Sequence, residues 1–187
     1  MRPPRRQPPS LPCMIGIDPS LNGTGVCIRQ SGGTYHFFHL QPSKGKIGIP
    51  RLLWLREQLN GVLMLDKIAE GLTLAIVEGY SMGSASRREA MGEWGGVLRC
   101  CLADAGIPEL ITVPPQTLKK FVIGHAKPGD SGKDVMLLKT FQRWGQSFND
   151  SDQCDAFCLV KAGEAIISGV GDPAGGLKKA SREKISA

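Results

Sequence analysis

Three continuous apolar runs predict buried strands, and two of them end in an acidic residue. They are CMIGID, which ends at Asp18, LTLAIVE, which ends at Glu78, and the shorter ELITV, which is followed by Pro114 and Pro115. Between the first two runs, GTGVCIRQ and TYHFFHL are separated by an SGG turn and predict a hairpin that continues from the first strand. Apolar runs of this length are typical of central strands covered on both faces.

Helical patterns alternate with the later strands. Leucines at helical spacing predict a helix from about residue 49 to residue 69. A second helix is expected over residues 86–106, two shorter ones over 116–124 and 132–145, and a last one from NDSDQC to about Ser168. This order of elements predicts an α/β fold, in which a mixed sheet carries helices on both faces.

The composition and the two ends of the chain suggest a single folded domain. A length of 187 residues suits one domain, and 41% apolar with 21% charged residues is typical of a soluble globular protein. Residues 1–13 are rich in proline and arginine, and residues 169–187 are small, polar and basic. We therefore expect a disordered arm over residues 1–13, one domain over residues 14–168, and a flexible tail over residues 169–187.

The charge and the cysteines narrow the class of protein further. A formal net charge of +6 favours a polyanionic partner such as nucleic acid. No apolar run is long enough to span a membrane, and the chain shows no secretory signal. The six cysteines include no C-x-x-C pair, which favours reduced thiols over a zinc site or a disulfide framework. We expect a cytoplasmic protein without an organic cofactor.

Four carboxylates are expected to converge. Asp18 and Glu78 end apolar strands, and in open α/β sheets sites form beyond the carboxyl ends of the strands. Asp152 and Asp155 lie three residues apart at the start of the last helix, so they share one helix face. That face continues as the apolar stripe that packs on the sheet. Such carboxylates repel one another unless cations separate them, and oxygen ligands suit two Mg²⁺ or Mn²⁺ ions.

Each acid alone has an ordinary structural explanation. Asp152 can be a residue that favours a helix start, and Asp18 before Pro19 can begin a turn. Glu78 can pair with Arg87 or Arg88. Asp155 is less easily explained, because aspartate is a poor choice within an apolar-stripe helix. The combined pattern of two strand-end acids and an i, i+3 pair favours a common site.

These motifs resemble the RuvC-type Holliday-junction resolvases of the RNase H-like superfamily, whose members are bacterial or bacteriophage proteins. The resemblance is carried by IGIDPSLNGTGVCI, AIVEGY, VPPQTLKKFVIG with SGKDVM, and DQCDAFCLV, which span residues 14 to about 168 in the family's order. It implies an RNase H-like fold with a five-stranded mixed sheet, the first three strands antiparallel. It also implies that Asp18, Glu78, Asp152 and Asp155 are a metal-binding catalytic tetrad.

The same resemblance assigns basic and aromatic residues to the DNA. Lys119 and Lys133 match the positions of phosphate-contacting catalytic lysines, with Lys120 and Lys127 as their alternatives. Tyr80 lies near the position of an aromatic that stacks on junction bases. The full set of expected DNA contacts is Tyr80, Arg87, Arg88, Lys119, Lys120, Lys127 and Lys133.

The expected function is that of a magnesium-dependent endodeoxyribonuclease that resolves Holliday junctions or other branched DNA. Two symmetric strands must be cut, so the resemblance implies a homodimer. The helix over residues 87–105, with Met91, Trp94, Gly95 and Leu98, is a candidate interface; alternatively it is a core helix.

Three other functions remain as alternatives. The chain can be a protein that binds branched DNA without cutting it. It can also be another RNase H-like nuclease, acting on flaps or RNA–DNA hybrids. A sugar-kinase or actin-like ATPase, with GIDPSLNGTG as a phosphate loop, is disfavoured because that class needs a second, duplicated domain.

Overall fold

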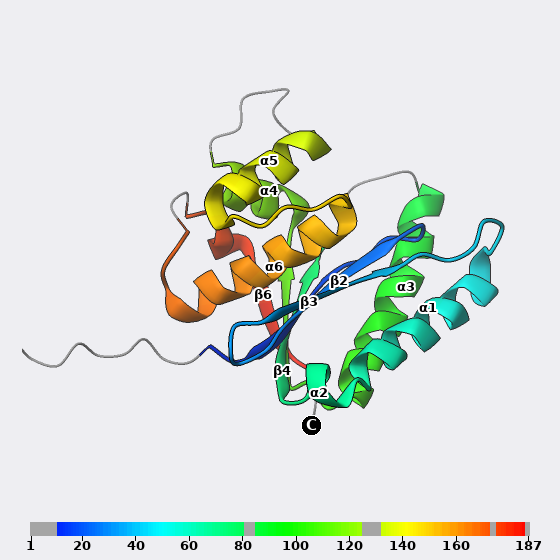
Figure 1. Cartoon of the computed structure of the whole chain (residues 1–187). Coiled ribbons are helices and arrows are strands. Elements are labelled where there is room, and N and C mark those ends of the chain that lie inside the picture. Colours follow the sequence, from blue (N-terminus) through cyan, green and yellow to red (C-terminus); the bar gives the residue numbers. More distant parts are fainter. Residues whose placement is uncertain (1–10, 81–84, 125–131, 173–174, 186–187) are drawn as a thin grey trace, which may run out of the picture.

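A computed structural model describes residues 11–80, 85–124, 132–172 and 175–185, without the side chains of residues 85–87 and 176. Its centre is a six-stranded mixed sheet in the order β3-β2-β1-β4-β5-β6 (Figure 1). The strands are β1 (Cys13–Asp18), β2 (Thr24–Arg29), β3 (Tyr35–Leu40), β4 (Leu72–Glu78), β5 (Glu109–Val113) and β6 (Ser181–Lys184).

The first three strands form the expected antiparallel meander. In it β1 pairs with β2, and β2 pairs with β3. On its other side β1 pairs in parallel with β4, and β4 in parallel with β5, so the carboxyl ends of these three strands point to the same edge of the sheet. Ile17 is paired with Val77, which places Asp18 and Glu78 as neighbours at that edge.

The expectation of five strands is wrong, because β6 adds a sixth. It pairs antiparallel with β5 and comes from residues 169–187, the segment expected to be a flexible tail. A short 3₁₀ helix, η1 (Gly176–Lys179), precedes it and buries Leu177 in the core. At the other end, the Arg29 guanidinium donates hydrogen bonds to the carbonyls of Leu11 and Pro12, which fixes the chain before β1. The rest of the expected arm, residues 1–10, lies outside the described residues.

Helices cover both faces of the sheet, as expected (Figure 1). One face carries α4 (Pro115–Ile123), α5 (Lys133–Trp144) and α6 (Ser151–Ser168), and the other carries α1 (Gly48–Leu63) and α3 (Ala85–Asp104). The single helix expected over residues 49–69 is divided into α1 and α2 (Asp66–Ala69). Within the described ranges, no helix is both long and apolar enough to cross a membrane.

The sheet separates two hydrophobic cores. Met14, Ile76 and Phe157 lie in the core beneath α6, while Ile15 and Trp94 lie in the core beneath α1 and α3. Trp94 is fully buried and Leu98 is 1% exposed. Within one chain, α3 is therefore a core helix, and these two side chains are not on its surface.

Glycines allow α6 to approach the sheet closely. A Cβ atom at Gly16 would lie 2.3 Å from the Ala156 carbonyl oxygen, and one at Gly25 would lie 1.9 Å from the Asp152 carbonyl oxygen. From the helix side, a Cβ at Gly163 would lie 2.8 Å from the side chain of Ile76. Larger residues at these positions would push α6 away from the strands, because packed cores have no free volume to absorb them.

Candidate active site

The four predicted carboxylates meet around one cavity of about 230 Å³. Asp18 and Glu78 reach it from the ends of β1 and β4, and Asp152 and Asp155 from the first turns of α6. Lys133 of α5 also lines it, together with Tyr80 and Arg88 from the β4–α3 side. The cavity therefore lies at the sheet edge where the parallel strands end, as the sequence predicted.

The start of α6 is fixed by Asp150, which is the N-cap residue. Its Oδ1 atom accepts hydrogen bonds from the backbone amides of Asp152 and Gln153, at 2.8 and 3.0 Å. Capping satisfies amides that have no partner within the helix and determines where the helix begins. The next residue, Ser151, donates its hydroxyl to Asp152 and accepts a hydrogen bond from the Lys133 ammonium group. This cap places Asp152 and Asp155 one turn apart beside the cavity.

Burial and mutual repulsion raise the pKa values of the acids. Burial is the largest cause for Asp18, whose pKa is well above its usual range, and the charges of Glu78 and Asp152 raise it further. Burial also raises the pKa of Glu78 to about 7, and that of Asp155 to about 7, where the charges of Asp18 and Asp152 add to the effect. Without a counter-charge the cluster therefore retains protons near neutral pH.

The cluster fits divalent cations. The Oδ1 atom of Asp155 is buried without a hydrogen-bond partner in the structure. A buried carboxylate oxygen without a donor is unfavourable, and a cation would satisfy it. The four acids offer only hard oxygen ligands, which suit Mg²⁺ or Mn²⁺. The raised pKa values of these acids also fit a cation site, because a bound cation would favour the ionised carboxylates.

The lysines predicted from the sequence take different places. Lys133 lines the cavity, and its charge opposes the raised pKa values of Asp18 and Asp155. Lys119 lies close enough to the cluster for its charge to lower the pKa values of Glu78 and Asp155. Lys120 is exposed on α4, so the geometry favours Lys119 of this pair. Lys127, the alternative to Lys133, lies outside the described residues.

Tyr80 lies at the mouth of the cavity. Its side chain rests on α3 against Gly95, where an added Cβ would lie 1.3 Å from the tyrosine oxygen. The hydroxyl accepts a hydrogen bond of 3.3 Å from Arg99, and the residue is 42% exposed. An exposed ring held in this way can stack on a base. Arg88 is exposed at the start of α3, and the side chain of Arg87 lies outside the described ones.

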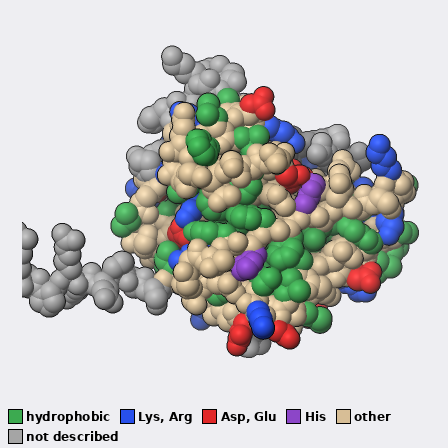
Figure 2. Space-filling view, viewed as in Figure 1, with side chains coloured by type: hydrophobic (Ala, Val, Ile, Leu, Met, Phe, Trp, Pro, Cys, Tyr) green, Lys and Arg blue, Asp and Glu red, His purple; other side chains and the backbone are tan. Residues whose placement is uncertain are grey.

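His39 and the capping role of Asp150 are parts of this site that were not predicted from the sequence. The imidazole Nδ1 of His39 lies 3.0 Å from Asp150 Oδ2, and its Nε2 lies 3.3 Å from Asp152 Oδ2. Figure 2 shows a histidine beside acidic side chains where α6 begins. These three residues also form a group whose ligand atoms lie within 4.8 Å of one another. The alternation in TYHFFHL places His39 on the same face as Tyr35, but only the fold shows that this face meets α6.

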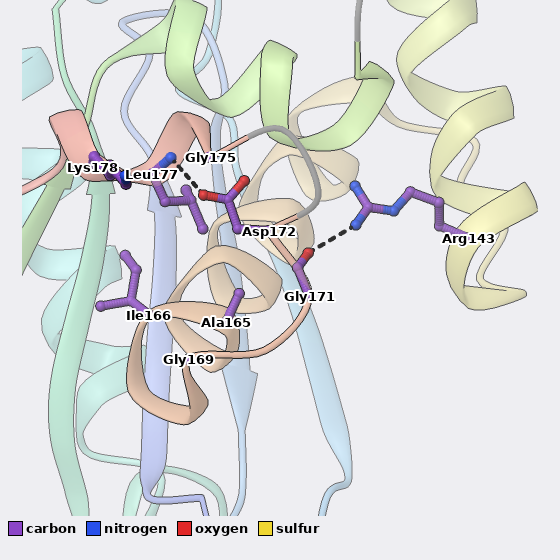
Figure 3. A pocket seen from close by; sticks show the side chains of 9 residues that line it. All are labelled: Arg143, Ala165, Ile166, Gly169, Gly171, Asp172, Gly175, Leu177 and Lys178. Atoms are coloured by element: carbon purple, nitrogen blue, oxygen red, sulfur yellow. Dashed lines mark hydrogen bonds between the residues drawn. The ribbon is translucent and has the colours of Figure 1, made fainter.

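A second, larger cavity of about 670 Å³ lies at the other end of α6 (Figure 3). The Arg143 guanidinium donates hydrogen bonds to the carbonyls of Val122 and Gly171, and Asp172 accepts one from the Leu177 amide. These polar groups hold the segment after α6 against α4 and α5. The cavity lacks the clustered carboxylates of the first one, so we assign the candidate active site to the sheet edge.

The element order, the sheet and the position of the acids define an RNase H-like fold. Among solved structures, the chain is similar to RuvC of Thermus thermophilus. One such structure, of the protein in complex with a Holliday junction substrate, has a TM-score of 0.66 and 15% identity, over 87% of this chain and 99% of that chain. Another has a TM-score of 0.62 and 19% identity, over 86% and 99%.

The resemblance inferred from the sequence is thus confirmed at the level of the fold, which is that of RuvC. No protein-family profile matches the chain, and no curated protein sequence matches it. The similarity to RuvC is therefore one of structure, whereas the candidate site is assigned from the residues of this chain.

Proposed function

We propose that this protein is a structure-selective endonuclease that cuts Holliday junctions or other branched DNA in the presence of Mg²⁺. The observation that carries the proposal is the convergence of four carboxylates with raised pKa values around one cavity. The RuvC fold supports it, since a RuvC with this fold was solved with a Holliday junction substrate. The net charge of +6 favours the same polyanionic partner. Such an enzyme would work in the cytoplasm of a bacterial cell or a phage-infected host.

Asp18, Glu78, Asp152 and Asp155 would hold two divalent cations, most simply Mg²⁺, with Mn²⁺ as a substitute. When bound, these cations supply the Lewis acidity that activates water and stabilises the leaving oxygen. The cation site is preorganised because the acids are carried by strand ends and by a capped helix.

The chain's own basic groups complete the proposed site. Lys133, at the cavity wall and hydrogen-bonded to Ser151, would contact the scissile phosphate and stabilise the negative charge that develops on it. Lys119 would contribute positive charge from the side of Glu78 and Asp155. Tyr80 and Arg88, at the mouth of the cavity, would hold the neighbouring nucleotides by stacking and phosphate contact.

We further propose that the enzyme acts as a homodimer. A four-way junction presents two symmetric strands, and a two-fold dimer places two sites in the same relation. The interface does not involve Trp94 or Leu98, which are buried within one chain.

Cleavage of a synthetic four-way junction with a mobile core tests the proposal. The purified protein is incubated with Mg²⁺ or Mn²⁺ and with linear duplex, flap and RNA–DNA hybrid controls. We expect paired nicks in the junction and little cleavage of the duplex. Preferred cleavage of flaps or hybrids would reassign the substrate, and tight junction binding without nicks would instead indicate a non-cleaving DNA-binding protein.

A further inference from the structure

His39, at the end of β3, contacts the first turn of α6 and is not among the residues that line the cavity. Its side chain is 23% exposed and lies between Asp150, the helix cap, and Asp152, the proposed ligand. The other oxygen of Asp152, Oδ1, accepts a hydrogen bond of 3.2 Å from Ser151. Each oxygen of this carboxylate therefore has a polar neighbour, Oδ1 the Ser151 hydroxyl through a hydrogen bond and Oδ2 the buried His39 Nε2 at 3.3 Å, a nitrogen that makes no hydrogen bond in the structure.

Strand register explains why His39 is near the site. Asp18 pairs with Gly25 across β1 and β2, and Gly25 pairs with His39 across β2 and β3. Residues paired across neighbouring strands project from the same face of the sheet, so these three form one row beneath α6. Gly25 in the middle has no side chain, and the Asp152 backbone occupies the free space above it. Asp18 and His39 thus flank the first turn of the helix.

A second glycine, Gly23, leaves the space that the contact between His39 and Asp152 needs. A Cβ atom at Gly23 would lie 2.4 Å from His39 Nε2 and 2.8 Å from Asp152 Oδ2. Any side chain there would displace the imidazole, the carboxylate or both. The contact between His39 and Asp152 therefore depends on two glycines, on the helix cap and on the register of three strands.

From this geometry we propose that His39 is a positioning residue that orients the Asp152 carboxylate and thereby sets the affinity of the site for divalent cations. The inference rests on the proposed function, in which Asp152 is a ligand. Polar groups that contact metal ligands orient them, and losing such a group typically weakens metal binding about 10–100-fold. In this role His39 does not touch the cation or the DNA.

The first test measures cation binding by the full-length protein without DNA. Mn²⁺ is titrated and the free ion is followed by electron paramagnetic resonance, for the wild type, His39→Ala, His39→Gln and His36→Gln. His36 is a matched control, because it lies on the same strand and contacts Gln30 instead of the acids. We expect His39→Ala to bind the same number of ions about 10–100-fold more weakly. His39→Gln, with a side-chain amide of similar reach, should recover part of the affinity, and His36→Gln should match the wild type.

The second test separates orientation from general structural support. Junction cleavage is measured as a function of Mg²⁺, and thermal unfolding is measured in the absence of cations. His39→Ala should need more Mg²⁺ for half-maximal cleavage and approach the wild-type rate at saturation, whereas a merely structural role would lower both the rate and the melting temperature at every concentration. Unchanged Mn²⁺ affinity, or a rate that stays low at saturating Mg²⁺, would overturn the proposal.

The number of bound ions decides between orientation and ligation. Loss of one whole ion in His39→Ala would mean that His39, Asp150 and Asp152 bind a cation directly, which also overturns the positioning role. Failure of the proposed function gives a different result. A wild-type protein that binds Mn²⁺ but leaves every branched DNA intact would contradict the nuclease assignment, while the Mn²⁺ comparison would still decide the role of His39. A wild type that binds no Mn²⁺ would contradict both.

Discussion

Replacing Asp155 with asparagine should stabilise the cation-free protein relative to the wild type as the pH rises, while abolishing cleavage. The folded protein raises the pKa of Asp155 from 3.8 to about 7. The native state therefore holds this proton at pH values where the unfolded chain has lost it, so stability falls as the pH rises from about 4 to 7 and then levels off. Each pKa unit corresponds to 1.36 kcal/mol, so ionised Asp155 costs the native state roughly 4 kcal/mol at pH 8.

The comparison of two pH values isolates this effect. The asparagine amide lacks complete hydrogen bonds at the buried site, which costs about 1–3 kcal/mol at any pH. Between pH 5 and pH 8, however, only the wild type loses its proton. The free energy of unfolding of Asp155→Asn relative to the wild type should therefore increase by about 3 kcal/mol over this interval.

Urea denaturation in EDTA at pH 5 and pH 8 measures this difference. Glu57→Gln serves as the control, because Glu57 is an exposed acid of α1 and its loss changes the net charge equally. Mg²⁺ should raise the melting temperature of the wild type more than that of Asp155→Asn, since a ligand that binds only the native state stabilises it. An equal stability difference at both pH values, or wild-type cleavage by the variant, would refute the assignment of Asp155 to the cation site.

Three further predictions concern packing, charge and DNA contact. Gly25→Ala should lower the free energy of unfolding by about 3 kcal/mol in urea denaturation, because the new methyl group would meet the Asp152 carbonyl. Gly61→Ala, at a position in α1 with open space around it, should raise the free energy of unfolding by up to about 1 kcal/mol. Lys133→Met should lower the single-turnover rate of junction cleavage roughly 100-fold, whereas the same change at exposed Lys120 should have little effect. Tyr80→Leu should weaken junction binding by about 1–3 kcal/mol in a fluorescence titration, with binding to linear duplex unchanged; equal loss on both DNAs would contradict base stacking.

The sequence predicted the centre of the fold because strong physical signals coincide there. An apolar run that ends in an acid determines both the strand and the place of its carboxylate, as for Asp18 and Glu78. The spacing of Asp152 and Asp155 does the same for the helix. Parallel strands then bring these ends to one edge, whatever the details of the loops between them.

The sequence could not predict features that depend on long-range pairing. The four residues of β6 are all exposed and polar, so they carry no apolar alternation. The strand forms through its backbone hydrogen bonds to β5 and through ion pairs of Arg182 with Glu109 and of Glu183 with Arg99. The apolar residues that accompany this strand are Leu177, which is buried before it, and Ile185, which packs against the core directly after it. His39 escaped notice for the same reason, because its partners are more than a hundred residues away.

The candidate site depends on glycines, which have no side chain, as much as on charged residues. Asp152 can reach the end of β1 only because Gly25 lets the first turn of α6 rest on β2, and Gly16 lets the next turn rest on β1. A similar fold occurs in a RuvC that is only 15% identical over 87% of the chain. Few identities are needed because the geometry is set by where strands end and how closely one helix approaches them. The cluster of acids, in contrast, destabilises the fold without cations, so neither stability nor packing accounts for placing four carboxylates there.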